Sequence, residues 1–227
     1  PIPTSVADAV AKAPGVEAVG NVRAGQAKAF GSVYNATAVN PDTSRIFSLD
    51  WKDGSDAVLA NLGEDGAFVD SGFAKDNHLQ VGSTLRQTFP NGRSATFRVK
   101  GIFKPPTGGS PFGPVTISAD TWDRFNPQPQ NLYSFVIMNG GETDTNRAAL
   151  DKALTEFPSA KVATRQEFID NQISGLSSVL NILYVLLALS ILVSFFGIVN
   201  TLVLTVFERT REIGMLRAVG MTRRQVR

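Results

Sequence analysis

The longest pattern in the chain is an apolar run near its C-terminal end. No charged residue occurs from Asn171 to Phe207, and the 29 residues from Val179 to Phe207 are mostly Leu, Ile, Val, Phe and Ala. A helix needs about 20 apolar residues to cross the hydrocarbon core of a bilayer, and at about 1.5 Å per residue this run reaches about 43 Å. The pattern predicts a membrane-spanning helix; a buried helix of a soluble protein is the alternative.

The charges that follow the run predict its orientation. Two acidic residues, Glu208 and Glu212, stand among six basic ones, which are Arg209, Arg211, Arg217, Arg223, Arg224 and Arg227. Basic residues close to the end of a span mark its cytoplasmic side. We therefore expect residues 208–227 to be cytoplasmic and residues 1–170 to be extracytoplasmic.

The first 165 residues alternate between helix and strand patterns and predict an α+β domain. Helix patterns occur at Ser5–Lys12, Ala119–Phe125 and Asn146–Phe157, and strand patterns at 16–22, 29–39, 67–70, 115–118, 132–138 and 161–163. A hairpin is predicted at 84–89 and 94–103 around Asn91-Gly92. The flanks 4–40 and 131–164 suggest an α/β subdomain, and 43–128 suggests a β-rich insert between them.

A helix start is predicted just before the apolar run. Thr164 is followed three residues later by Glu167, the arrangement of a capping box. A helix beginning near Gln166 would run through a stalk and into the membrane. We therefore assign 166–207 to the stalk and transmembrane helix.

Composition restricts the chemistry of the chain. Its net charge is +2, it has no Cys, and His78 is its one histidine. With the basic excess at the C-terminal end, nucleic acid is not an expected partner, and neither a metal site nor a catalytic triad has the residues it needs. The Gly-rich stretch from Thr107 to Ser110 lacks the Gly-Lys-Ser/Thr ending of a phosphate-binding loop. We expect no catalytic, cofactor or metal site, and interpret His78 as a turn or packing residue.

The segment after the span has a helical pattern of its own. Ile213, Leu216 and either Val219 or Gly220 fall on one side, Glu208 can pair with Arg211 and Glu212 with Arg209, and Gly220 is placed to end a helix. The pattern predicts a short amphipathic helix with an apolar edge that inserts into a protein groove. A basic anchor on anionic lipid is the alternative.

This segment and the residues around it, Phe207-Glu-Arg-Thr-Arg-Glu-Ile-Gly-Met-Leu-Arg-Ala-Val-Gly-Met-Thr-Arg-Arg-Gln-Val-Arg227, resemble the signature of ABC transporter permeases of the FtsX/MacB/LolC-LolE superfamily. Stretches at 14–19, 67–70, 79–85 and 99–102 resemble the extracytoplasmic domain of that superfamily. The resemblance implies a porter-like subdomain in the flanks and a coupling segment between the second and third of four transmembrane helices; the other three helices are not in this chain. It also implies ten contacts to a cytosolic ATPase: Glu208, Arg209, Arg211, Glu212, Ile213, Gly214, Leu216, Arg217, Val219 and Gly220.

The resemblance further implies a function in which this chain itself catalyses no reaction. We expect a multi-pass permease subunit of the bacterial cell membrane that couples ATP hydrolysis by a cytosolic ABC ATP-binding subunit to movement of its outer domain. Membrane lipids and a second permease half or a second copy are the other expected partners. Export of amphiphiles, extraction of lipoproteins and control of a cell-wall hydrolase all remain open. A membrane-anchored sensor or binding domain, and an anchored hydrolase, are the alternatives outside transport.

Overall fold

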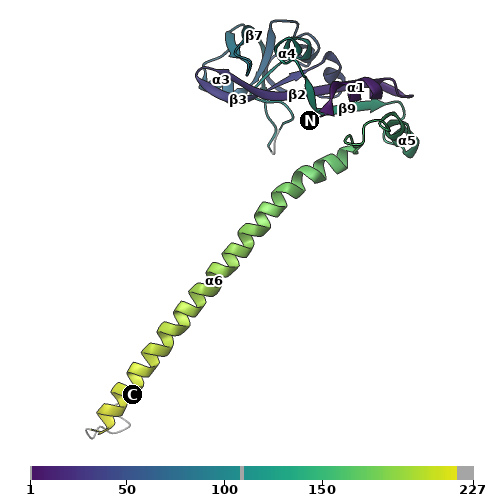
Figure 1. The fold of residues 1–227 in the computed structure, drawn as a ribbon. Helices are drawn as coiled ribbons and strands as arrows, with labels where there is room; N and C mark the ends of the chain where they lie inside the picture. The colour runs from purple at the N-terminus through teal and green to yellow at the C-terminus, as the bar shows by residue number, and fades with distance from the viewer. Residues whose placement is uncertain (1, 108–109, 219–227) are drawn as a thin grey trace. The chain divides into compact units, whose positions relative to one another are not determined.

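The computed structural model describes residues 2–107 and 110–218. The chain divides into two compact units, Pro1–Val162 and Ala163–Arg227. Figure 1 shows the strands and short helices of the first unit and the long helix of the second.

The first unit is built around one twisted sheet. Its helical elements are α1 (Thr4–Ala11), η1 (Pro41–Arg45), α2 (Ala57–Ala60), α3 (Ser71–Asp76), α4 (Ala119–Phe125) and α5 (Asp144–Ala153). Its strands are β1 (Ile2–Pro3), β2 (Val16–Ala29), β3 (Ser32–Val39), β4 (Asp50–Asp53), β5 (Gly66–Asp70), β6 (Thr84–Thr88), β7 (Ser94–Lys104), β8 (Val115–Ser118) and β9 (Gln130–Met138). In the described residues all nine strands belong to one sheet, which runs through the predicted flanks and the predicted insert.

Six of the strands close into a ring. β2 pairs with β3, β3 with β8, β8 with β5, β5 with β7, β7 with β6, and β6 returns to β2 through the pair Lys28↔Thr88. Inward-facing residues alternate along these strands and form the largest core cluster, which includes Leu85, Phe97, Val99 and Ile117. Closure of the ring removes free edges from most of these strands.

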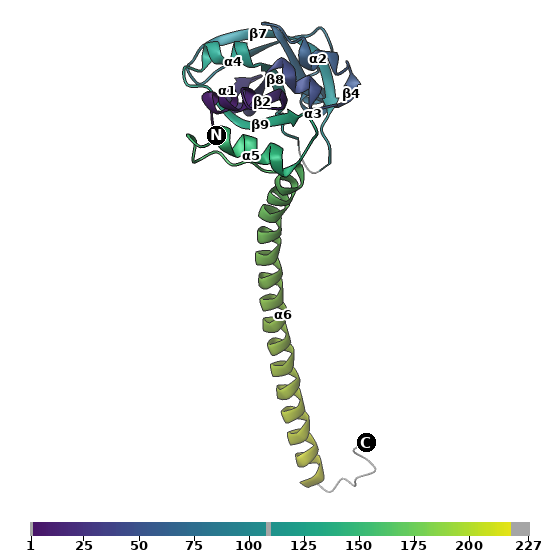
Figure 2. The ribbon, with the colours of Figure 1, turned by 90° about the vertical axis from the view of Figure 1, so that its right-hand side faces the viewer.

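β2 belongs both to the ring and to the part of the sheet outside it, where it pairs with β9. Its first half pairs antiparallel with β9, and its second half pairs with β3 from Val22↔Val39 to Ala29↔Ser32. The pairing with β9 shifts register between Val22 and Arg23. Figure 2 shows α1 and α5 beside the β2–β9 part, where they contribute Val10 and Leu150 to a separate core cluster.

A third cluster covers one outer wall of the ring. Phe68 and Phe103 point outward from β5 and β7 and pack against Phe112 and the segment from Phe47 to Leu62. The rings of Phe47 and Phe135 meet edge to face at 4.8 Å. This wall is therefore closed to solvent by η1, α2, β4 and the connections between them.

Asp56 organises the connection that covers this wall. Its carboxylate accepts hydrogen bonds from Trp51 Nε1 at 2.7 Å, Leu49 N at 3.0 Å and Ser48 Oγ at 2.7 Å. The hydrogen bond from Trp51 makes the largest contribution to lowering the pKa of Asp56 below its ordinary value, and the bonds from Ser48 and Leu49 lower it further. Because the pKa of Asp56 is lower in the folded state than in the unfolded state, its ionised carboxylate stabilises the fold at every pH above the unfolded-state pKa. This stabilisation is lost as the pH falls through the folded-state pKa.

We therefore expect Asp56→Asn to lower the free energy of unfolding of the first unit by about 1–2 kcal/mol at pH 7. Denaturant titration of the full chain followed by tryptophan fluorescence measures this difference. The difference between wild type and variant should shrink when the titration is repeated below about pH 4, near the pKa of an unperturbed Asp. A difference that is the same at both pH values would contradict this role of the carboxylate.

Most predicted elements of the first unit are confirmed. The strand at 115–118 and the helix at 119–125 have the predicted bounds, and the hairpin at 84–103 is formed by β6 and β7. The predicted strand at 161–163 is wrong, because these residues have no strand partner; Val162 instead packs against the α1–α5 cluster. β1, β4 and α2 were not predicted.

The second unit is dominated by α6 (Arg165–Ala218), a helix of 54 residues. Its predicted capping box is confirmed: Thr164 Oγ1 accepts from Glu167 N at 3.1 Å, and Glu167 Oε2 accepts from Thr164 N at 2.7 Å. Within the described residues, α6 is the helix long and apolar enough to span a membrane, from Val179 onward.

Candidate functional site

The predicted coupling residues lie on the last three turns of α6. Glu208 to Arg217 continue the apolar helix without a break, so the predicted coupling helix is the end of the membrane helix itself over this range. Glu208, Arg209, Arg211, Glu212, Ile213, Gly214, Leu216 and Arg217 are all exposed. Val219 and Gly220, and with them the predicted helix end, lie outside the described residues.

One side of this segment carries the predicted apolar edge. Arg209, Ile213 and Leu216 are spaced by four and three residues and therefore lie in one row on the helix. Ile213 and Leu216 expose 40% and 44% of their surface. Two neighbouring aliphatic side chains beside a guanidinium can contact a groove that is apolar in its centre and acidic at its rim.

A neighbouring row carries Glu208, Glu212 and Met215. Met215 exposes 58% of its surface and was not among the predicted contact residues, although an exposed apolar side chain three residues after Glu212 is visible in the sequence. Neither of the predicted ion pairs, Glu208 with Arg211 and Glu212 with Arg209, is formed in the described part of the segment. These charges have no ionic partner within α6.

Gly214 lies in a third row with Thr210 and Arg217, on the side of the helix away from Leu216. A Cβ added at this position would meet no atom within 4 Å. Glycine in a helix interior costs about 1 kcal/mol relative to alanine, and no packing inside the described chain explains it. The position leaves room for another backbone to approach the helix closely.

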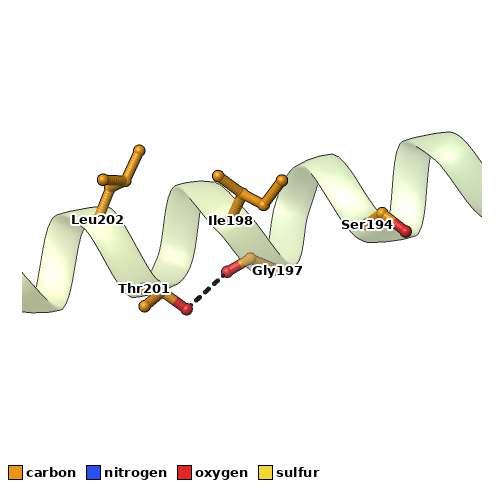
Figure 3. A pocket seen from close by; sticks show the side chains of 5 residues that line it. All are labelled: Ser194, Gly197, Ile198, Thr201 and Leu202. Atoms are coloured by element: carbon orange, nitrogen blue, oxygen red, sulfur yellow. Dashed lines mark hydrogen bonds between the residues drawn. The ribbon is translucent and has the colours of Figure 1, made fainter.

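The apolar part of α6 satisfies several of its own polar groups. Figure 3 shows a shallow hollow lined by Ser194, Gly197, Ile198, Thr201 and Leu202, in which Thr201 Oγ1 donates to Gly197 O at 3.0 Å. Thr205 and Thr210 donate in the same way to the carbonyls of Thr201 and Val206. A membrane helix requires such internal hydrogen bonds because lipid tails provide no partners.

The predicted turn role of His78 is confirmed. His78 has a φ of 53°, lies two residues after the end of α3 and is exposed. Asp70, one of the scattered acidic residues, caps α3 by accepting a hydrogen bond from Phe73 N at 2.6 Å. In the described residues no three His, Asp or Glu side chains come together in a way that could hold a metal ion.

Two family models match this chain. The MacB-like periplasmic core domain matches residues 1–156, and the C-terminal region of FtsX-like permeases matches residues 184–227. The first match covers more than half of the chain and all strands of the first unit, and the second covers most of α6 and the coupling segment.

One curated relative and two solved structures are similar to the chain. An uncharacterized ABC transporter permease of Methanocaldococcus jannaschii is 26% identical over 190 residues, which are 81% of this chain and 50% of the relative. This chain therefore spans about half the length of that relative. The periplasmic region of MacB from Actinobacillus actinomycetemcomitans covers 77% of this chain, and 83% of its own, with a TM-score of 0.52 and 14% identity. The extracellular domain of the ABC-type transporter YknZ from Gram-positive bacteria covers 70% of this chain and 86% of its own, with a TM-score of 0.49 and 12% identity.

These findings agree with the two units of the structure. The likeness to the MacB region shows the fold of the first unit, and the family models give an extracytoplasmic domain joined to a permease helix. The predicted resemblance and the predicted α+β fold followed by a long apolar helix are confirmed. The chain belongs to the MacB- and FtsX-like family of ABC transporter permeases, as a membrane protein with an extracytoplasmic domain.

Proposed function

We propose that this chain transmits movement between a cytosolic ABC ATP-binding subunit and an extracytoplasmic domain. The ATP-binding subunit contacts the coupling segment, residues 208–220, and the contact is carried by the ten predicted residues from Glu208 to Gly220 together with Met215. In this proposal residues 1–170 are extracytoplasmic and residues 208–227 are cytoplasmic. A second permease half or a second copy of the chain completes the membrane assembly.

The uninterrupted length of α6 is the observation that carries the proposal. The helix begins at a capping box and continues to Ala218 with no change of secondary structure. At about 1.5 Å per residue, its 54 residues span about 81 Å. A displacement of the coupling segment is therefore passed along one rigid element instead of being absorbed by a joint.

The coupling segment has the surface that such a contact requires. Ile213, Leu216 and Met215 are exposed apolar side chains, the charged residues beside them are free of ion pairs within the helix, and Gly214 permits close approach. An apolar centre with charged residues around it is typical of protein interfaces.

Movement of the outer domain is the output of this mechanism. We propose that displacement of α6 moves two parts of the outer domain relative to each other, namely the flanks (4–40 and 131–164) and the β-rich insert (43–128). This movement would release or expel a substrate. The flanks and the insert meet within the sheet where β3 pairs with β8 and where Lys28 on β2 pairs with Thr88 on β6.

Co-purification tests the proposal. The full-length membrane protein, extracted in mild detergent from its own cells, is expected to carry an ATP-binding subunit in a fixed ratio, with ATPase activity in the complex. Correctly inserted protein that carries no ATP-binding subunit would contradict the proposal and favour an anchored sensor or binding domain.

A further inference from the structure

Acidic residues are absent from two long stretches of the first unit. Neither Asp nor Glu occurs in residues 18–41 or in residues 77–119, although the chain has 20 acidic residues in all. The second half of β2, all of β3, and β6, β7 and β8 lie in these stretches. The fold therefore joins the two acid-free stretches in one wall of the strand ring.

Three cations lie on the outer side of this wall. Lys28 on β2 stands opposite Val33 on β3 and Thr88 on β6. Arg86 stands opposite Thr96, and Arg98 opposite Thr84, so the two arginines are diagonal neighbours on β6 and β7. The side chains of Lys28, Arg86 and Arg98 are exposed.

These cations, like Lys12 and Lys52 elsewhere on the unit, have no carboxylate partner among the described residues. Arg23 pairs with Asp123, Arg124 with Glu64 and Lys104 with Asp50, whereas Lys28, Arg86 and Arg98 form no ion pair in the part of the chain that the structure describes. Diagonal like charges on neighbouring strands repel each other. An anionic partner would remove this repulsion.

An exposed apolar tip adjoins the cations. Phe30 and Gly31 form the two-residue turn between β2 and β3, with φ values of 49° and 82°. A positive φ is rare for a bulky side chain, and such positions cluster at functional sites. Phe30 exposes 52% of its surface and Val33 63%.

The opposite outer wall shows that this exposure is not general. There the outward side chains of Phe68 and Phe103 are fully buried under the segment from Phe47 to Leu62. Among the residues that the structure describes, no such layer covers Lys28, Val33 or Arg86, which are all exposed. We define the basic face as Lys28, Phe30, Val33, Arg86 and Arg98.

We propose that the basic face binds anionic lipid headgroups, with Phe30 and Val33 inserted between them. An exposed apolar tip beside several cations is the combination that binds an anionic bilayer surface, where each cation contributes to affinity and apolar side chains enter the headgroup boundary. The proposal goes beyond coupling, because it gives the outer domain a preferred contact with the membrane in which its own helix is anchored.

Site-specific quenching tests the proposal. The chain has no Cys, so Ser32→Cys allows one fluorophore to be placed at the tip, and Ser5→Cys places it on α1 as a control. The full chain is reconstituted in nanodiscs that carry headgroup-nitroxide lipid in either neutral phosphatidylcholine or a phosphatidylcholine–phosphatidylglycerol mixture. We expect strong quenching of the Ser32 label in the anionic discs, little in neutral discs, and little at the Ser5 label in both.

Charge variants make the test specific. Combined Lys28→Gln, Arg86→Gln and Arg98→Gln should weaken the contact about fivefold for each cation removed, and 0.5 M salt should weaken it in the wild type, as expected for screened charges. The matched control, Lys12→Gln with Lys52→Gln and Lys152→Gln, removes the same charge elsewhere and should leave the quenching unchanged. Circular dichroism verifies that both triple variants are folded. Equal quenching in neutral and anionic discs, or none in either, would overturn the proposal; the second result would favour an acidic protein partner.

Discussion

Leu216→Asp is expected to release the ATP-binding subunit from the coupling segment. Burial of a leucine side chain in an interface contributes about 1.5–3 kcal/mol, and the carboxylate that replaces it would be left desolvated and unpaired. Together these effects should weaken the contact by about 3 kcal/mol or more, which is more than 100-fold. The amount of ATP-binding subunit retained on the purified permease measures the loss.

Leu216→Met is the matched control for this substitution. It keeps an apolar side chain of similar volume at the same position of α6 and is compatible with a helix. The control should retain the ATP-binding subunit. Equal loss in both variants would point to a disturbed helix or membrane insertion, and equal retention would contradict a contact through Leu216.

Gly175→Pro is expected to separate binding of the ATP-binding subunit from movement of the outer domain. Proline in a helix interior removes a backbone hydrogen bond and costs about 3 kcal/mol, which introduces a joint between the stalk and the membrane part of α6. The coupling segment is unchanged, so the complex should remain assembled. The ATP-dependent change in hydrogen exchange of residues 1–162 should fall about tenfold or more, because the displacement ends at the joint.

The control for the joint is Gly175→Ala, which keeps the backbone hydrogen bond and favours the helix. It should preserve both assembly and the ATP-dependent change. An undiminished response in Gly175→Pro would show that α6 is not the route by which movement reaches the outer domain.

Local signals in the sequence predicted local structure well. The capping box at Thr164 and Glu167 is a pattern of side chain and backbone that depends on four residues only, and the structure has both of its hydrogen bonds. The bounds of the helix at 119–125 and of α6 up to its apolar part follow in the same way from periodicity and composition.

Contacts between distant segments were not predictable in this way. A strand over 29–39 was expected, but the chain turns at Phe30-Gly31, where the usual Asn-Gly signal is absent. The residues at 161–163 have a strand pattern and yet form no strand, because β propensity is realised only where a partner is available. Closure of the ring through Lys28 and Thr88 joins residues 60 positions apart, and no short sequence pattern indicates this pairing.

In the candidate site, too, the local features were predictable from the sequence and the contacts between side chains were not. Its position was predicted from a motif, and the rows that contain Ile213, Leu216 and Glu212 follow from helix geometry. The ion pairs predicted within the segment are not formed, because i,i+3 pairs on an exposed helix contribute only a few tenths of a kcal/mol. The basic face was missed, since it arises only when two acid-free stretches are brought together by the sheet.

Cross-linking from the coupling segment in native membranes tests the central claim most directly. Because the chain has no Cys, Leu216→Cys provides one attachment point for a short photo-activated cross-linker, and Phe196→Cys on the apolar part of α6 provides the control. We predict a cross-link from Leu216→Cys to an ATP-binding subunit, identified by mass spectrometry, and none to that subunit from Phe196→Cys. Correctly inserted protein whose Leu216→Cys position cross-links only to lipid would contradict the account.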